Sequence, residues 1–176
     1  DGSNDGSLEY LGHFMQENQG FRLLKRKHLG KAGAVTAGVL KAQGSIVLFS
    51  DMDQATPIEE LDKLLPYFDP SAGDYDIVIG SRATRRKGAP WTRVLMAKGM
   101  IFLRSLLVGL HGITDTQCGF KAFKREVAQR LFKKLKLYSN IKETRGSKVS
   151  AGFDVELLYL AKKLGYKIEE VPVEWL

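Results

Sequence analysis

The sequence predicts an α/β domain with a mixed, mostly parallel sheet flanked by helices. Two apolar runs, at residues 45–50 and 76–80, have the length and composition of buried strands, and polar residues follow each of them. Segments with helical periodicity alternate with these runs. An alternation of strand, helix and strand predicts parallel pairing through right-handed crossovers.

The elements that precede residue 51 follow one another closely. Their periodicity predicts a helix at 5–18, a short strand at 21–24, a helix at 31–42 that opens at Gly30, and a strand at 45–50. A parallel α/β domain normally opens with a strand, whereas this chain opens with the turn-like sequence Asp-Gly-Ser-Asn-Asp-Gly-Ser. We therefore expect residues 1–176 to be a single domain that lacks its first strand through an amino-terminal truncation.

The segment after residue 55 carries a strong helix start signal. Thr56 has the residue type of an N-cap, Pro57 occupies the first helical position and Glu59 completes a capping box. Apolar residues at helical spacing follow, namely Ile58, Leu61, Leu64, Leu65 and Phe68. The sequence therefore predicts a helix here with one apolar face.

The composition is that of an ordinary globular protein. Of 176 residues, 44% are hydrophobic and 27% are charged, which allows a buried core and argues against disorder. The net charge of +7 predicts an anionic partner without choosing between nucleic acid, a phospholipid surface and a phosphorylated small molecule. The single cysteine, Cys118, excludes an internal disulfide and a cysteine-cluster zinc site, and we expect it to be packed. The chain has no uninterrupted apolar run of about 18 residues, the length that predicts a membrane-spanning helix.

Two carboxylates one residue apart, Asp51 and Asp53, directly follow the strand predicted at 45–50. The carboxyl ends of such strands are where open α/β sheets bind their ligands. Two acids this close repel each other, so a cation between or beside them is expected when both are ionised. Oxygen ligands of this kind select Mg²⁺ or Mn²⁺, with substrate phosphates filling other positions. The alternative is a pair of solvated loop acids, because the pattern also occurs by chance.

Seven motifs occur in the order found in one enzyme family. They are Asp1-Gly-Ser-x-Asp-Gly, Gly30-Lys31, Val47-Leu-Phe-x-Asp51-x-Asp53-x-x-Thr-Pro57, Asp76-Ile-Val-Ile-Gly-Ser-Arg82, Asp115-Thr-Gln-Cys-Gly-Phe-Lys121, Phe153-Asp-Val-Glu156 and Val171-Pro-Val-x-Trp175. With them the chain resembles the GT-A fold, family 2 glycosyltransferases. The nearest branch is that of the polyprenyl-phosphate glycosyltransferases, which act on dolichyl phosphate. The form of the fifth motif favours the glucosyl over the mannosyl members.

The resemblance implies a Rossmann-like GT-A sheet and a donor site at its edge. It places three residues against the nucleotide, namely Asp1, Ser3 and Asp51. Asp53 is expected to be the main metal ligand, with Asp51 beside it. Gly30 and Lys31 begin a helix, where backbone N–H groups and the helix dipole favour anions, so we expect Lys31 to steady the nucleotide. The alternative for Lys31 is a surface lysine.

The acceptor chemistry points to arginines. A lipid monophosphate is already largely ionised at pH 7, because its second pKa is about 6, so proton abstraction is of minor value. The site must instead bring two anions together, which requires cations. Arg82, at the end of a predicted strand, and Arg93, early in the next helix, are the candidates, with surface arginines as the alternative.

Three further acids are assigned by resemblance. Asp115 is expected near the sugar and the acceptor, where it either orients sugar hydroxyls or acts as a weak base. A turn or capping role is the alternative for Asp115. Asp154 and Glu156 are expected beside the path of the acceptor, although Asp154 also has the position of an N-terminal helix acid.

Two segments bear on contact with a membrane. Residues 91–110 combine apolar residues with Arg93, Lys98 and Arg104. This pattern suits a helix that lies at an anionic membrane surface, or alternatively a core helix. Residues 138–150 are polar and predict either a mobile flap over the acceptor or a surface insertion.

The residues and the resemblance together predict an inverting glycosyltransferase. A sugar, with glucose favoured, is expected to move from UDP-glucose, or alternatively from GDP-mannose, to a polyprenyl or dolichyl phosphate. Mg²⁺ or Mn²⁺ is the expected cofactor. The protein is expected to bind peripherally at the cytoplasmic side of a membrane and to bind no nucleic acid. Two alternatives stay open, a family 2 enzyme with a non-lipid sugar acceptor and a non-catalytic basic module for membranes or nucleic acid.

Overall fold

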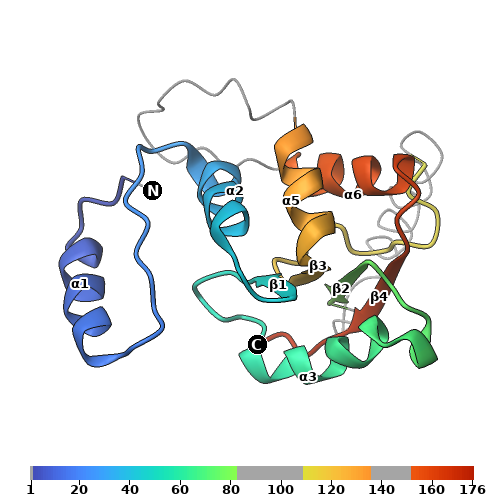
Figure 1. The fold of residues 1–176 in the computed structure, drawn as a ribbon, viewed down its shortest axis with the longest axis horizontal. Helices are drawn as coiled ribbons and strands as arrows, with labels where there is room; N and C mark the ends of the chain where they lie inside the picture. Colours follow the sequence, from blue (N-terminus) through green and yellow to red (C-terminus); the bar gives the residue numbers. More distant parts are fainter. Residues whose placement is uncertain (1, 83–108, 136–151) are drawn as a thin grey trace, which may run out of the picture.

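A four-stranded sheet forms the centre of the computed structural model, which describes residues 2–82, 109–135 and 152–176 (Figure 1). In chain order the elements are α1 (Ser7–Glu17), α2 (Gly30–Lys41), β1 (Ile46–Phe49), α3 (Leu61–Leu64) with 3₁₀ turns at Ile58–Glu60, Leu65–Phe68 and Pro70–Ala72, β2 (Ile77–Ser81), β3 (Lys121–Lys124), α5 (Arg125–Lys134), α6 (Phe153–Lys163) and β4 (Ile168–Pro172). The helix expected at 91–110 lies outside the described residues up to residue 108, and the flap expected at 138–150 lies wholly outside them.

Strand β3 runs against the direction of the other three strands and lies between β1 and β2. The order across the sheet is β1, β3, β2, β4, with β3 antiparallel to β1 and β2, and β4 parallel to β2. Three strands therefore share one direction, and the predicted mixed α/β class is confirmed. Direct parallel pairing of the strands now labelled β1 and β2 is wrong, because the antiparallel strand separates them.

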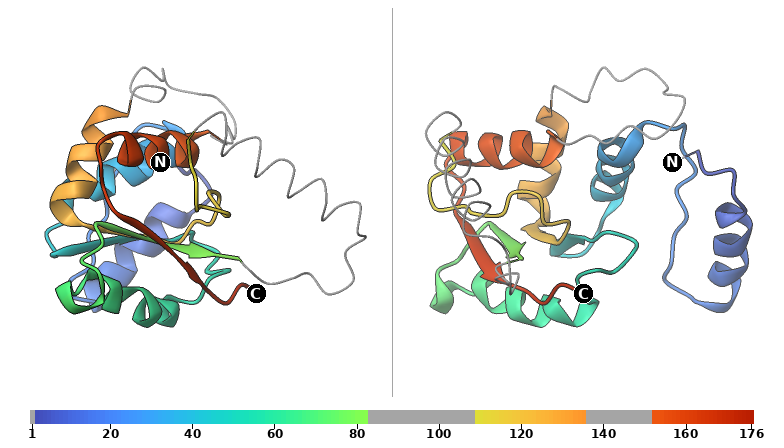
Figure 2. Two further views of the ribbon diagram at one scale, coloured as in Figure 1. Left: turned by 90° about the vertical axis from the view of Figure 1, so that its right-hand side faces the viewer. Right: turned by 180° about the vertical axis from the view of Figure 1, so that it is seen from behind.

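Helices cover both faces of the sheet. Figure 2 shows α2, α5 and α6 on one face, and α3 with its flanking turns on the other. Side chains alternate between the faces along each strand, so Ile77 and Ile79 of β2 join one core cluster and Val78 joins the other. Phe123 and Ala122 of β3 divide in the same way. The sheet is thus buried between two helical layers.

Most predicted elements match α1, α2, β1 and β2 closely, but two predictions of local structure are wrong. Residues 21–24 form no strand. The helix predicted after Thr56 is divided into a 3₁₀ turn (Ile58–Glu60), the single turn α3 and a second 3₁₀ turn (Leu65–Phe68). Pro66 lacks a backbone N–H, so the α-helical hydrogen bonds end there. No side-chain hydrogen bond caps the first turn, so the predicted capping box is absent.

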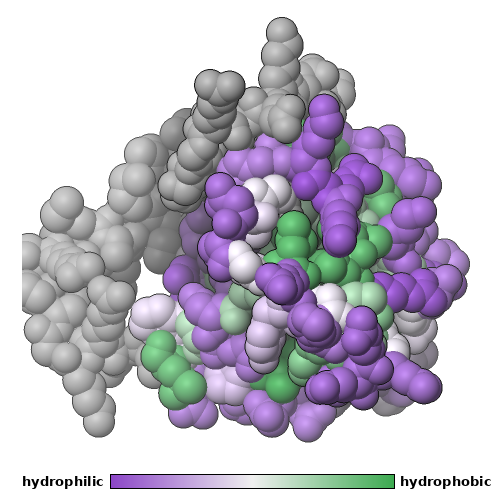
Figure 3. Space-filling view, turned by 90° about the vertical axis from the view of Figure 1, so that its left-hand side faces the viewer, coloured by the Kyte–Doolittle hydropathy of each residue, from purple (hydrophilic) through white to green (hydrophobic). Residues whose placement is uncertain are grey.

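Helix α1 stands apart from the layered part of the molecule (Figure 1). None of its residues is buried. Figure 3 views the molecule from the α1 side, where the surface is mostly hydrophilic and hydrophobic residues gather in patches. Across the described ranges, no helix combines the length and the apolar composition needed to cross a bilayer.

The sheet has an open edge at β1. In the described ranges β1 pairs with β3 alone, and a groove of about 540 Å³ runs between β1 and α2. The outer edge of β1 therefore presents backbone groups that a further strand can pair with. The expectation that the sheet lacks a first strand stays a prediction.

Replacing Phe123 tests the core on the α5 side of the sheet. Its ring is fully buried. The centroid of the Phe123 ring lies 6.0 Å from the centroid of the Phe49 ring and 6.1 Å from that of the Phe132 ring. Phe123→Ala leaves a cavity, so we expect the free energy of unfolding to fall by about 3–5 kcal/mol in chemical denaturation. Tyr10→Ala, at a side chain that is 71% exposed, is the control and should change it by about 0.5 kcal/mol or less. Equal effects of the two changes would contradict this core assignment.

Candidate functional site

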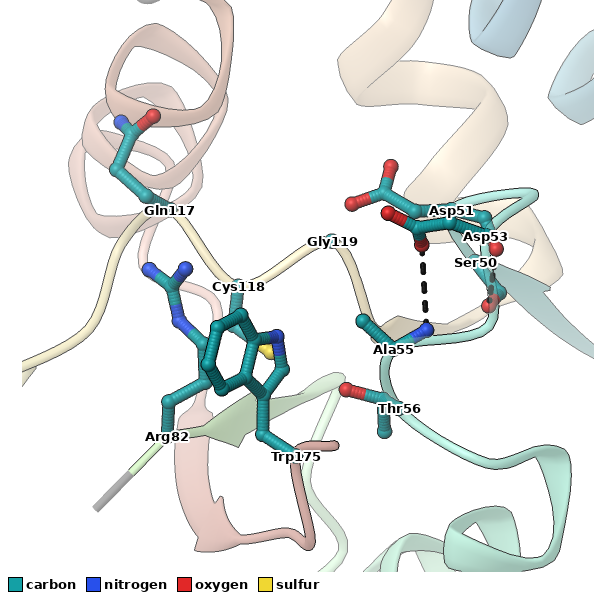
Figure 4. A pocket seen from close by; sticks show the side chains of 10 residues that line it. All are labelled: Ser50, Asp51, Asp53, Ala55, Thr56, Arg82, Gln117, Cys118, Gly119 and Trp175. Carbon is teal, nitrogen blue, oxygen red and sulfur yellow. Dashed lines mark hydrogen bonds between the residues drawn. The ribbon is translucent and has the colours of Figure 1, made fainter. Parts of the chain in front are cut away.

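A small pocket lies at the edge of the sheet where β1, β2 and β4 end and β3 begins (Figure 4). Its volume is about 40 Å³, and it is lined by Ser50, Asp51, Asp53, Ala55, Thr56, Arg82, Gln117, Cys118, Gly119 and Trp175. Because β3 runs against its neighbours, its first residues meet the last residues of β1 and β2, and β4 ends beside the end of β2. Segments far apart in the sequence thereby line one pocket.

The turn after β1 presents Asp51 and Asp53 to this pocket. The backbone N–H of Gln54 donates to the carbonyl oxygen of Asp51 over 3.2 Å, and Gln54 has a φ of 48°. The backbone N–H of Ala55 donates to Asp53 Oδ1, also over 3.2 Å, as in an Asx turn. Figure 4 shows the two carboxylates next to each other on one wall. The structure thus brings the two predicted acids together.

Lys31 reaches Asp51 from the start of α2. Lys31 Nζ lies 2.6 Å from Asp51 Oδ1, and the two side chains are 39% and 44% exposed. An ion pair this exposed contributes little to stability, so its importance is its place beside the pocket. Gly30, the first residue of α2, is buried and has a φ of 74°, a conformation that favours glycine. The predicted pair Gly30 and Lys31 therefore stands next to the two acids.

The amino-terminal turn lies against the segment that leads into α2. A Cβ atom on Gly2 would lie 2.8 Å from Cβ of His28, so the two segments touch. Ser3 is exposed. Asp1 and Arg93, which were predicted for the nucleotide and the acceptor, lie outside the described residues.

Arg82 and Asp115 form a bidentate ion pair at the end of β2. Arg82 Nε lies 2.7 Å from Asp115 Oδ2 and Arg82 Nη2 lies 2.9 Å from Oδ1, while the backbone N–H of Arg82 donates to Oδ2 over 3.0 Å. Burial raises the pKa of Asp115, but the hydrogen bonds and charge of Arg82 outweigh it and leave the pKa below its ordinary value. The hydrogen bonds that Arg82 donates to Asp115 in turn raise the pKa of Arg82. Asp115 is therefore an ionised acceptor of hydrogen bonds and a poor acceptor of protons.

Glu170 of β4 holds the loop that carries Asp115. Its carboxylate accepts hydrogen bonds from the backbone N–H groups of Thr114 and Asp115, both over 2.7 Å, and from the Thr114 hydroxyl over 2.8 Å. Asp115 is thus fixed at its backbone by Glu170 and at its side chain by Arg82. Glu170 was not among the residues predicted for the site, because a glutamate on a short strand carries no recognisable pattern.

Asp154 is buried in an ion pair with Lys121. Asp154 Oδ1 lies 2.6 Å from Lys121 Nζ, and the side chains are 6% and 0% exposed. Lys121 Nζ also donates to the carbonyl oxygen of Cys118. Burial lowers the pKa of Lys121, and the charge of Asp154 opposes this shift. Asp154 is an acid in the first turn of α6, as its position in the sequence suggested. The expectation that it stands beside the path of the acceptor stays a prediction.

The segment of Cys118 and Gly119 lies directly against Asp51. A Cβ atom on Gly119 would lie 1.9 Å from Asp51 Oδ2, so any side chain at this position would displace the Asp51 carboxylate. The Cys118 side chain is 1% exposed, and burial raises the pKa of its thiol. The prediction that Cys118 is packed is confirmed.

The segment after β4 closes the pocket on the remaining side. The backbone N–H of Glu174 donates to Glu60 Oε2 over 2.9 Å, and that of Leu176 donates to the carbonyl oxygen of Ala55 over 2.8 Å. Trp175 lies between these two anchors, and its side chain lines the pocket (Figure 4). Trp175 appeared in the sequence only within a family motif, without a role at the site.

Asp51 and Asp53 have donor atoms that fit a hard divalent cation. Among the residues that the structure describes, no three acid, histidine or cysteine side chains form a cluster that could hold a metal. A cation here would have two protein carboxylates, the number with which Mg²⁺ commonly binds phosphates and water. In the described ranges Asp53 takes part in no ion pair, whereas Asp51 is paired with Lys31. Asp53 therefore offers the freer carboxylate.

Comparison with known proteins gives a consistent result. The family model for glycosyl transferase family 2 matches residues 1–132. A dolichyl-phosphate beta-glucosyltransferase of Drosophila melanogaster is 38% identical over 99% of this chain and 53% of its own length. The enzymes of the same name from Dictyostelium discoideum and Homo sapiens are 36% and 37% identical, over 99% and 85% of this chain and 53% and 44% of their own lengths.

The chain spans about half the length of the curated relatives it matches. The family match nevertheless covers β1 to β3 and the residues at their ends that line the pocket. These are Asp51 and Asp53 after β1, Arg82 after β2, and Cys118 and Gly119 before β3. The resemblance drawn from the sequence motifs is confirmed, and the chain belongs to glycosyl transferase family 2.

Proposed function

We propose that this chain is the catalytic domain of an inverting enzyme that transfers glucose from UDP-glucose to dolichyl phosphate. The enzyme would act as a peripheral protein at the cytoplasmic side of a membrane. The observation that carries the proposal is the convergence of Asp51, Asp53 and Arg82 on one pocket, because the reaction must bring a diphosphate and a phosphate together. Family membership and the names of the relatives support the substrates.

The donor is proposed to bind on the side of the pocket formed by β1 and α2. Asp53, with Asp51, would hold Mg²⁺ or Mn²⁺, and when bound the ion supplies positive charge to the diphosphate of the donor. Lys31 adds a second cation at the start of α2, where the helix dipole also favours an anion.

The acceptor is proposed to bind on the side of Arg82. The guanidinium group can give one of its two hydrogen bonds with Asp115 to a phosphate oxygen, while the other keeps it oriented. An ionised phosphate oxygen then forms a bond to the anomeric carbon of the sugar. The bond from that carbon to the diphosphate breaks, and its electron pair leaves with the nucleoside diphosphate. Attack opposite to the leaving group inverts the configuration.

A donor and acceptor panel tests the proposed reaction. The purified chain is incubated with UDP-glucose or GDP-mannose, with Mn²⁺ or Mg²⁺, and with a short polyprenyl phosphate, and release of nucleoside diphosphate is measured. We expect release from UDP-glucose that depends on both the metal and the lipid phosphate. Release that needs a sugar acceptor instead would support the non-lipid alternative. Binding to anionic vesicles without any release, unaffected by Asp53→Ala, would support the non-catalytic alternative.

Removal of Asp53 tests the metal assignment. Asp53→Ala takes away the freer carboxylate of the pair, so we expect metal-supported turnover to fall by about 100-fold or more. Asp62→Ala removes an exposed acid on α3 and is the matched control, which should keep wild-type turnover. If both changes reduce turnover to the same extent, Asp53 is not a metal ligand.

The pH dependence separates ionisation of the acceptor from ionisation of Asp115. The pKa of Asp115 lies below its ordinary value, so this side chain stays ionised in mildly acidic solution. A phosphate monoester takes up a proton as the pH falls through about 6, so kcat/KM should decline there. Asp115→Asn should lower the rate without moving this acid limb. Loss of the acid limb in Asp115→Asn would instead identify Asp115 as the base.

A further inference from the structure

Lys121 places a charged group inside the protein directly behind the pocket. Its side chain is 0% exposed, and its ammonium group donates to Asp154 Oδ1 over 2.6 Å and to the carbonyl oxygen of Cys118. The ammonium nitrogen also lies 5.4 Å from the centroid of the Phe49 ring. The transfer reaction described above gives none of these groups a role.

Stability alone does not account for this ion pair. Desolvation of two buried charges offsets most of their mutual attraction, and apolar side chains of similar volume can replace such a pair without loss of stability. Apolar residues cannot replace the contact between Lys121 and Cys118, because only a hydrogen-bond donor can satisfy the Cys118 carbonyl oxygen in this position. The contact with Cys118 is therefore what distinguishes Lys121 from an apolar residue.

The Cys118 carbonyl belongs to the segment that shapes the donor side of the pocket. Cys118 and Gly119 both line the pocket. Gly119 lies so close to Asp51 that an added Cβ atom would be 1.9 Å from Oδ2. A shift of this segment therefore moves the wall on which the Asp51 carboxylate rests, and with it the carboxylate that Lys31 contacts.

We propose that Lys121 and Asp154 are positioning residues that hold the Cys118 and Gly119 segment against Asp51 and thereby set the geometry of the donor site. Asp154 stabilises the charge of the Lys121 ammonium group and fixes its orientation toward Cys118. Lys121 acts on the site through its hydrogen bond to the Cys118 carbonyl oxygen. The inference rests on the proposed function for the identity of the donor. The placement of the segment is independent of it.

The experiment uses Cys118, the single cysteine of the chain, as a reporter of its own segment. Lys121→Met and Asp154→Leu are combined in a double variant, because either change alone leaves one buried charge without its partner and destabilises the fold. We expect the double variant to unfold cooperatively on heating, as the wild type does. Its Cys118 should react with a soluble disulfide reagent about tenfold faster, since local opening is easier without the hydrogen bond from the charged donor.

Affinity for UDP in the presence of MnCl₂ links the segment to the donor site. Calorimetry should show binding about tenfold weaker in the double variant than in the wild type, because the closed segment is no longer held by Lys121 in the position that places it against Asp51. Lys124→Met is the matched control on the same strand, where the ammonium is partly exposed and lies 2.6 Å from Asp74 Oδ1. Both the Cys118 reaction rate and the UDP affinity of this control should equal those of the wild type.

A folded double variant with the wild-type Cys118 reaction rate would overturn the inference. Faster reaction with unchanged UDP affinity would overturn it as well. If the double variant fails to fold, Lys121→Met combined with Asp154→Asn replaces it, because this pair also leaves no buried charge and the amide keeps the size of the Asp154 side chain, and the same increase in Cys118 reactivity is expected. If the wild type binds no UDP, the proposed function fails, while the Cys118 reaction rates still decide whether Lys121 holds the segment.

Discussion

The direction of β3 is the constraint on which the site depends. Lys121, the first residue of β3, is paired with Phe49 at the end of β1 and with Ile79 near the end of β2. The residues just before Lys121 therefore lie beyond the ends of both strands, beside Asp51 and Arg82. A parallel β3 of the same length would begin at the opposite edge of the sheet, about 10 Å away. One antiparallel strand thus creates the pocket.

The acids near the pocket differ in whether a cationic side chain is paired with them. Asp115 is paired with Arg82, Asp51 with Lys31, and Asp154 with Lys121. Asp53 accepts a hydrogen bond from a backbone N–H and, within the described ranges, meets no cationic side chain. A divalent ion approaching this pocket would displace no lysine or arginine from Asp53. The pairing therefore favours Asp53 over its neighbour as the first contact of a metal.

The sequence predicted what depends on neighbours along the chain and missed what depends on partners across the fold. Asp51 and Asp53 could be found because a buried strand and a polar end are a local pattern. Pro66, which ends the α-helical hydrogen bonds after α3, is also a local signal. An unbroken helix was predicted nevertheless, because the capping signal at Thr56 was given more weight than the proline. Strand β3 was missed because Lys121 has the residue type of a surface position. Only its pairing with Asp154, 33 residues away, makes that lysine compatible with burial.

The directions of the pKa shifts bear on which kind of acceptor suits this site. At the site, Arg82 holds the pKa of Asp115 below its ordinary value, and Asp115 in turn raises the pKa of Arg82. Among the residues that the structure describes, no histidine lines the pocket. A sugar hydroxyl acceptor needs a group tuned to take a proton near neutral pH, which requires an acid with a raised pKa or a histidine. A phosphate acceptor brings its own charge and needs a guanidinium group to receive it, and Arg82 provides one at the pocket wall. The electrostatics of the described site therefore favour an acceptor that arrives already ionised.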